Sequence, residues 1–411
     1  MAEQGGTTLD PTVPADVQPD GVERWKLCVA AARQWTGQDD QAMETREFAR
    51  RLYDSSVPTS DELAEGFEEN LHPRRRDGEF RRKPQIVRPV ASSEPKVSLE
   101  QIEALGLNRW PQPSASTKKV LGDHVDTAAM WSVKRKATAG DSPAHAPYKV
   151  ARRGLHDKIV GSRLGSAVGS LLGDHHPLTI KLKAGDRLSD EDKQTIRDAA
   201  DAAREDDDSQ SPDALFMAGG PASGKSTVLE HNPGLKPTHS VAIDCDSLKL
   251  DLPEYQQLRV AGDRYAASAV HTESGDIAAR LAHEAGDLRL NVVIDGTGNS
   301  ERGAFTRDLL KQHEKGYDVS VIYATTSTDT AVRRAVDRAE ATGRFVPVPA
   351  VREQHAKVSA NFQDIVNLDW LVSLDVYNET GHIGEMTEEG DFYDIDGGAM
   401  NAFRAKADER A

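Results

Sequence analysis

The chain has 411 residues, enough for one large domain with a smaller one or for two medium-sized domains, and a formal net charge of −16. Its hydrophobic content of 37% and aromatic content of 5% are low for a chain that packs from end to end, so part of it is expected to lie outside a core. It has no long apolar run, no signal-like start and only two distant cysteines, which argues against membrane, secreted and disulfide-rich proteins and favours a cytoplasmic location.

The first 184 residues are expected to form three segments ahead of any larger domain. Residues 1–20 are rich in Pro, Gly and Asp and are interpreted as a disordered tail. Residues 21–71 carry apolar side chains at helical spacing, which predicts a small helical module. Residues 72–184 contain many prolines among basic and small polar residues, and we interpret them as a basic, Pro-rich linker with short elements.

The basic stretch 72–163 within this acidic chain has two interpretations. Its lysines and arginines could attract a polyanion such as nucleic acid. A solvated linker is the alternative, and it is favoured because Pro, Ser and Gly interrupt the basic residues. Residues 72–80 faintly resemble segments of phage structural proteins, which adds a phage-associated location as a second option.

From residue 185 onward, β-like and helical patterns alternate along the chain. A helix is expected from the capping residue Ser189 to about residue 204. The β-like runs are residues 215–218, 240–244, 290–294, 319–324 and 370–376, and the helical stretches are residues 254–285, 301–315, 329–341 and 350–361. This alternation predicts an α/β domain over residues 185–385, with a mostly parallel sheet flanked by helices as in P-loop NTPase-type kinases. Residues 386–411 are interpreted as an acidic C-terminal tail.

The strongest motif is a Gly-x4-Gly-Lys-Ser loop between the first predicted strand and a helix. In such loops, backbone N–H groups surround the phosphates of a nucleotide. Lys225 is expected to reach the β- and γ-phosphates of ATP or GTP, and the Ser226 hydroxyl is expected to bind Mg²⁺. The predicted nucleotide-binding residues are Gly219, Gly220, Pro221, Ala222, Ser223, Gly224, Lys225, Ser226 and Thr227.

Two further predicted strands end in acidic residues. Asp244 and Asp246 follow the run Val-Ala-Ile, and Asp246 is a candidate general base. Asp295 opens an Asp-Gly-Thr-Gly turn and is a candidate carboxylate for Mg²⁺. In isolation each pattern is also typical of a helix cap or a turn. Their shared position after successive strands favours a binding site, because open α/β sheets bind ligands at the carboxyl ends of their strands.

Four arginines follow in the predicted helix 329–341 and the turn after it: Arg333, Arg334, Arg338 and Arg344. Arginines on a mobile flap can close over phosphates and neutralise the charge that develops during transfer. The alternative is a solvated helix whose arginines pair with neighbouring acidic residues.

Taken in this order, the motifs resemble those of the zeta toxin family of P-loop kinases. The matching segments are residues 211–226, 243–246, 271–274, 295–298, 337–338, 342–347 and 377–381. The resemblance covers about residues 185–385. It implies an enzyme that uses ATP and Mg²⁺ to phosphorylate the 3′-hydroxyl of the sugar of UDP-N-acetylglucosamine, and an antitoxin-like inhibitor as a protein partner.

The same resemblance implies roles for individual residues. Asp246 matches the catalytic base, Lys225 the P-loop lysine, and Arg338 and Arg344 the two lid arginines. Asn299 stands where the better-known members carry an arginine, a difference that bears on the acceptor rather than on phosphoryl transfer. The residues near the sugar-nucleotide pocket would be Glu273, Asp295, Thr297 and Asn299.

Two other functions stay open at this point. The domain could be a P-loop kinase for nucleic-acid ends or another hydroxyl acceptor, guided to a polyanion by residues 72–163. Alternatively, the chain could be a phage structural or interaction protein in which the P-loop domain is auxiliary.

Overall fold

The computed structural model describes residues 109–133, 148–204, 210–296, 298–299, 303–342, 345–387 and 389–408. The chain divides into two units, Met1–Arg74 and Arg75–Ala411, and all described residues belong to the second. The predicted tail, the small helical module and the first part of the predicted linker therefore lie outside the described residues. No helix in the described part is long and apolar enough to cross a membrane.

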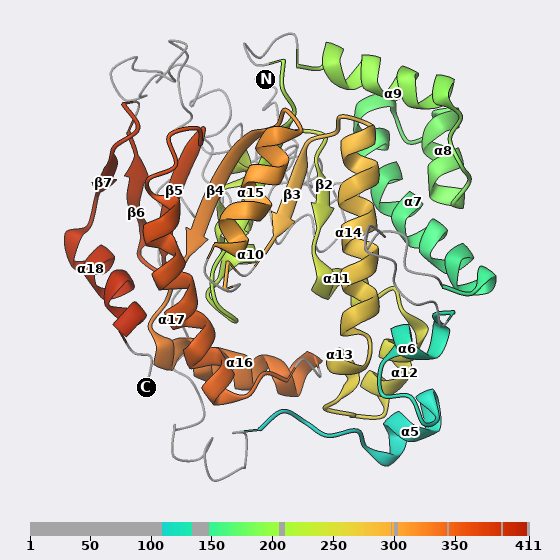
Figure 1. Cartoon of the computed structure of the whole chain (residues 1–411), viewed down its shortest axis with the longest axis horizontal. Coiled ribbons are helices and arrows are strands. Elements are labelled where there is room, and N and C mark those ends of the chain that lie inside the picture. Colours follow the sequence, from blue (N-terminus) through green and yellow to red (C-terminus); the bar gives the residue numbers. More distant parts are fainter. Residues whose placement is uncertain are drawn as a thin grey trace, which may run out of the picture. The chain divides into compact units, whose positions relative to one another are not determined.

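A seven-stranded sheet with the order β2-β3-β1-β4-β5-β6-β7 forms the centre of the domain (Figure 1). The first five strands in this order run parallel, and β6 and β7 are added antiparallel. The α/β class and the mostly parallel sheet predicted from the sequence are confirmed. The strands are β1 (Asp213–Ala218), β2 (Val241–Ile243), β3 (Val292–Asp295), β4 (Asp318–Ala324), β5 (Ser373–Asn378), β6 (Gly381–Met386) and β7 (Phe392–Asp394).

The central strands are apolar on both faces because helices cover both sides of the sheet. Along β1, Phe216 belongs to the main core cluster, whereas Leu215 and Met217 pack with Val228 of α10 (Lys225–His231) on the other face. Continuous apolar runs of this kind are typical of buried parallel strands. The main core also receives α14 (His271–Asp287), α15 (Ala304–Glu314) and α17 (Val348–Ile365).

The sequence predicted one helix over residues 254–285, and the structure divides this stretch into three. These are α12 (Pro253–Val260), α13 (Ala266–Ala269) and α14. Gly262 has a left-handed φ of 66°, and the side chain of Asp263 accepts a hydrogen bond from the Tyr265 backbone N–H. This turn interrupts the helical hydrogen bonds, which the apolar periodicity alone does not reveal.

Residues 150–184, which we expected to be linker, form two packed helices in the structure. Helix α7 (Val150–Leu172) has 23 residues and lies against α8 (Pro177–Ala184). A Cβ atom added to Gly161 would lie 2.1 Å from the Leu182 carbonyl oxygen, so only glycine allows this approach. Leu155, Ile159, Leu164 and Val168 do recur at helical spacing and reach the main core, a signal that the linker interpretation passed over. The other helices of the described part before β1 are α5 (Ala115–Leu121), α6 (Thr127–Trp131) and α9 (Asp190–Ala202).

The segment 386–411, expected to be an acidic tail, contributes to the core through its described residues. It contains β7 and α18 (Gly397–Ala405), and the short helix η5 (Lys406–Asp408) follows. Phe403 of α18 is 2% exposed, and its ring contacts Phe362 and Tyr323 at centroid distances of 5.2 and 5.9 Å. Acidic residues lie on the outside of this segment. They dominate its composition, so the composition does not reveal the apolar side chains that are buried.

Replacing Phe403 with alanine tests whether this segment is part of the fold. Phe403→Ala should lower the free energy of unfolding by about 3–5 kcal/mol, because it leaves a cavity among packed aromatic rings. Tyr393→Ala is the matched control, since Tyr393 is 59% exposed and its removal should change stability by about 0.5 kcal/mol or less. Urea denaturation measures both. Two equally small effects would restore the interpretation as a loosely attached tail.

Candidate active site

A cavity of about 1620 Å³ opens at the carboxyl ends of β1, β2 and β3. The strand order reverses at β1, since β3 and β2 lie on one side of it and β4 and β5 on the other. Open α/β sheets bind ligands at this kind of position. Helix α16 (Thr328–Thr342) lies beyond these strand ends (Figure 1), and several of its residues line one wall of the cavity.

The glycine loop follows β1 directly and is held close to its neighbours. A Cβ atom at Gly219 would lie 2.4 Å from the Ala324 carbonyl oxygen, and one at Gly220 would lie 2.3 Å from His355 Cδ2. Gly224, with a φ of 97°, adopts a backbone conformation that other residues rarely take. Residues 221–227 line the cavity, while Gly219 and Gly220 are not among the lining residues and shape the loop from behind.

His355 of α17 supports the loop from the side opposite the cavity. Its Nε2 donates a hydrogen bond of 3.0 Å to the Pro221 carbonyl oxygen. Burial, together with the nearby Lys406 and Lys225, lowers the pKa of His355 to about 4 against the opposing effect of the hydrogen bond to Pro221, so the ring is neutral at physiological pH. The sequence analysis missed this residue, because nothing in the local pattern of the predicted helix 350–361 separates it from a surface histidine.

Lys225 lies between the loop and the end of β3. Its ammonium group donates to the Gly219 carbonyl oxygen at 2.9 Å and lies 3.7 Å from Oδ1 of Asp295. Burial raises the pKa of the Asp295 carboxyl, and Lys225 opposes that shift. A raised pKa means that ionising this carboxyl group costs free energy unless a cation lies nearby. This is the behaviour expected of a carboxylate that binds a metal ion.

The two aspartates after β2 make different contacts. Asp244 caps α11 (Cys245–Lys249), because its side chain accepts hydrogen bonds from the backbone N–H groups of Asp246 and Ser247. Asp246 lies two residues further, and its Oδ1 accepts a hydrogen bond of 2.7 Å from Lys249 Nζ. Both aspartates and Lys249 line the cavity.

Lys249 is a second residue that the sequence analysis missed. Its side chain is only 6% exposed, and burial lowers its pKa. A lysine three residues after an aspartate on a short helix was the available signal, but this spacing is common on helix surfaces. Its burial in the cavity wall becomes apparent only once the sheet is assembled.

Arginines of α16 form the opposite wall of the cavity. Arg333, Arg334 and Arg338 all line it, together with Asp337. Burial lowers the pKa of Arg338, while the carboxylate of Asp295 raises it in part. Arg334 lies 3.7 Å from Glu379, which follows β5. Arg344, the second predicted lid arginine, lies outside the described residues.

Glu273 is not in the cavity, although we predicted it near the sugar-nucleotide pocket. It is completely buried on α14, where Arg152 Nη2 donates to its Oε2 at 2.8 Å and His156 Nε2 lies 2.6 Å from its Oε1. Arg152 also donates to both carboxylate oxygens of Glu254, at 2.9 and 2.8 Å. The carboxylate is therefore committed to an internal ion network, which does not support direct contact with an acceptor.

The remaining predicted pocket residues are only partly placed. Asn299 is half-buried and is not among the cavity-lining residues, whereas Gly296 and Gly298 on either side of the turn are. Asn361 of α17 donates to the Gly298 carbonyl oxygen at 2.8 Å, which fixes the turn. Thr297 lies outside the described residues.

Comparison with known proteins agrees with the motif pattern. Residues 197–396 match the family model described as zeta toxin. Among solved structures, the AvrRxo1-ORF1:-ORF2 complex with ATP has a TM-score of 0.46 at 15% identity, covering 68% of this chain and 82% of that chain. A chain of the PezAT toxin–antitoxin system of Streptococcus pneumoniae has a TM-score of 0.34 at 15% identity, covering 54% and 97%. No curated protein sequence matches the chain significantly.

The ion network predicts that Glu273 acts on stability, with a defined pH dependence. Burial alone would raise the pKa of Glu273, but hydrogen bonds from Arg152 and His156 outweigh it and hold the pKa at about 2. Glu273→Gln should lower the free energy of unfolding at pH 7 by about 1.5–3 kcal/mol. Because the folded-state pKa is depressed, the contribution of Glu273 is fully present above its ordinary pKa of about 4.3, and the difference from wild type should shrink as the pH falls from there towards 2.

Urea denaturation at several pH values measures this effect. Glu284→Gln is the control on the same helix, because Glu284 pairs with Arg280 at the surface and should contribute about 0–1 kcal/mol. Unchanged stability of Glu273→Gln together with weaker acceptor binding would instead place Glu273 in the ligand site.

Proposed function

With a zeta toxin domain at residues 197–396 as the premise, we propose that the protein is an ATP-dependent phosphotransferase that phosphorylates the 3′-hydroxyl of the sugar of UDP-N-acetylglucosamine. One observation carries the proposal: Lys225, Asp246, Asp295 and Arg338, which come from four different elements, line the same cavity. At about 1620 Å³, this cavity exceeds the roughly 300–1,000 Å³ of a site for one small ligand, which leaves room for a nucleotide and a sugar nucleotide together.

The donor side of the site consists of the loop and the end of β3. Backbone N–H groups of residues 222–227 would surround the phosphates of ATP or GTP, and Lys225 would move from its present partners to the β- and γ-phosphates. Ser226 and Asp295 would hold Mg²⁺, which supplies charge neutralisation on the phosphates when bound. The raised pKa of Asp295 supports this role, because a nearby cation stabilises its ionised form.

The acceptor side is centred on Asp246. Lys249 holds one carboxylate oxygen of Asp246 and thereby fixes the orientation of the other. Asp246 would take the proton of the acceptor hydroxyl while the hydroxyl oxygen bonds to the γ-phosphorus, and the bond from that phosphorus to the bridging oxygen of the leaving diphosphate breaks. Arg338 and Arg344 would neutralise charge on the transferring group.

The identity of the acceptor rests on the resemblance to the zeta toxin family, and so does the expectation of an antitoxin-like inhibitor. Asp295, Thr297 and Asn299 remain the candidate contacts for the sugar nucleotide. Kinase activity on nucleic-acid ends is less well supported, because part of the basic stretch is neutralised internally. Arg152 is buried against two glutamates, and Arg163 donates to Asp251 at 2.5 Å.

Mass spectrometry of UDP-N-acetylglucosamine after incubation with the protein, ATP and Mg²⁺ tests the proposal. We expect a product heavier by one phosphate, with the new phosphate on the sugar 3′-oxygen. Lys225→Met should lower the rate by at least about 100-fold, because it removes the charge that meets the transferring phosphate. ATP hydrolysis without a phosphorylated sugar nucleotide would reject this acceptor and retain the nucleotide site. A fully active Lys225→Met would reject the nucleotide site itself.

Substitutions of the two aspartates after β2 should have different effects, one on the transfer rate and the other on stability. Asp246→Asn is nearly isosteric and should preserve ATP affinity while lowering the transfer rate by about 10²–10⁴-fold, since it removes the base. Asp244→Asn should act mainly on stability, by about 0.5–2 kcal/mol, because Asp244 caps α11. Parallel measurement of nucleotide affinity, turnover and unfolding decides between them. A fully active Asp246→Asn would eliminate Asp246 as the base.

A further inference from the structure

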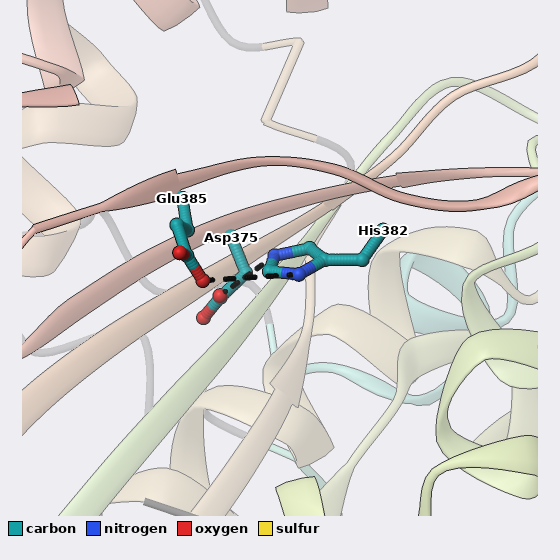
Figure 2. Close-up of side chains that lie close together, drawn as sticks. All are labelled: Asp375, His382 and Glu385. Atoms are coloured by element: carbon teal, nitrogen blue, oxygen red, sulfur yellow. Dashed lines mark hydrogen bonds and ion pairs between the residues drawn. The ribbon is translucent and has the colours of Figure 1, made fainter. Parts of the chain in front are cut away.

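Three side chains of the types that bind metal ions converge on one face of the β5–β6 pair. Figure 2 shows the imidazole of His382 next to the carboxylates of Asp375 and Glu385. His382 Nε2 lies 3.1 Å from Asp375 Oδ1, and His382 Nδ1 lies 3.9 Å from Glu385 Oε2. One potential ligand atom from each residue lies within 4.8 Å of the other two.

The backbone register forces the two carboxylates together. Asp375 and Glu385 are direct partners across the antiparallel pair. Like charges in directly opposed positions destabilise a sheet, so this arrangement needs a positive charge nearby. Within the described residues, the imidazole of His382 forms ion pairs with both of these carboxylates. A cation bound by His382 and the two carboxylates would supply that charge.

The imidazole is already held in position. Its ring stacks on Tyr377 with a centroid distance of 4.6 Å and an angle of 21° between the planes. The side chains of His382 and Asp375 are only 16% and 14% exposed, whereas that of Glu385 is 39% exposed and can rotate. Two fixed ligands and one adjustable ligand, with an open side towards water, suit an ion that enters from solution.

We propose that Asp375, His382 and Glu385 bind a divalent transition-metal ion, with Zn²⁺ as the best fit. One imidazole nitrogen and two carboxylate oxygens are ligands that Zn²⁺ accepts, and imidazole disfavours Mg²⁺ and Ca²⁺ relative to transition metals. Ligands about 2.1 Å from a tetrahedral ion lie roughly 3.4 Å apart, close to the present separation of His382 Nε2 and Asp375 Oδ1. Rotation of Glu385 supplies the third ligand, and water completes the shell.

The site lies directly behind a wall of the nucleotide cavity. Tyr377 lines that cavity and also stacks on His382. The ion would fasten β6 to β5 next to Tyr377 and so fix the position of this wall. The proposal concerns the hairpin itself and stands whether or not the cavity phosphorylates a sugar nucleotide.

Calorimetric titration of the full chain with Zn²⁺, in the presence of excess Mg²⁺, tests the proposal. We expect one tightly bound Zn²⁺ per chain and a higher thermal unfolding midpoint when it is bound. His382→Ala and the nearly isosteric Glu385→Gln should each raise the dissociation constant at least about tenfold. His283→Ala is the matched control, because His283 is 54% exposed and lies 3.9 Å from Asp287 at the surface of α14, and its loss should leave Zn²⁺ binding unchanged.

A second control separates this site from the nucleotide site. Asp295→Asn should leave the affinity for Zn²⁺ unchanged, since Asp295 belongs to the cavity. Binding of Co²⁺ should produce visible absorption bands that disappear in His382→Ala. Equal Zn²⁺ affinities in wild type, His382→Ala and Glu385→Gln would overturn the proposal and leave the three side chains as ion pairs. Loss of binding in Asp295→Asn alone would assign the ion to the nucleotide site and overturn it as well.

Discussion

The close approach of the glycine loop to β4 and α17 is the constraint on which the site depends. Gly219 lies against the Ala324 carbonyl group, and Gly220 lies against the ring of His355, so neither position has room for a side chain. Lys406, near the end of the described chain, donates to the backbone just after β4 and fixes the strand end that the loop touches. The shape of the loop, set locally by its glycines, is thus held by residues more than a hundred positions further along.

The charged side chains of the cavity stay ionised because oppositely charged side chains lie next to them. Burial raises the pKa of Asp295 and lowers the pKa values of Lys249 and Arg338, so each group is ionised at a cost that nearby opposite charges offset. Lys225 faces Asp295, and Lys249 faces Asp246. Under the proposed function, a ligand that brings phosphates and a metal ion would replace these pairs with its own charges.

Features that depend on short stretches of sequence could be predicted. The environments of single residues that depend on contacts between distant parts of the chain could not. The five parallel strands and the glycine loop follow from short apolar runs and a fixed motif, and the carboxyl ends of β1, β2 and β3 meet at one cavity as expected. Glu273 was misplaced because its environment is set by Arg152, 121 residues earlier in the chain, which takes its carboxylate out of reach of the cavity. Lys249 was missed for the same reason, since only the assembled sheet distinguishes a cavity wall from a helix surface.

The helices ahead of the family-matched segment belong physically to the domain that carries the site. Arg152 of α7 binds Glu254 of α12 and Glu273 of α14, and Tyr148 donates a hydrogen bond of 2.6 Å to Asp276 of α14. The first turn of α14 lines the cavity, so α7 braces the element that forms this wall. Removing one partner from such a network leaves a buried charge uncompensated, which is strongly destabilising. The segment 197–396, which matches the zeta toxin family model, therefore depends on residues 148–172 for the position of its own cavity wall, and a fragment that starts at residue 197 lacks a contact on which the site rests.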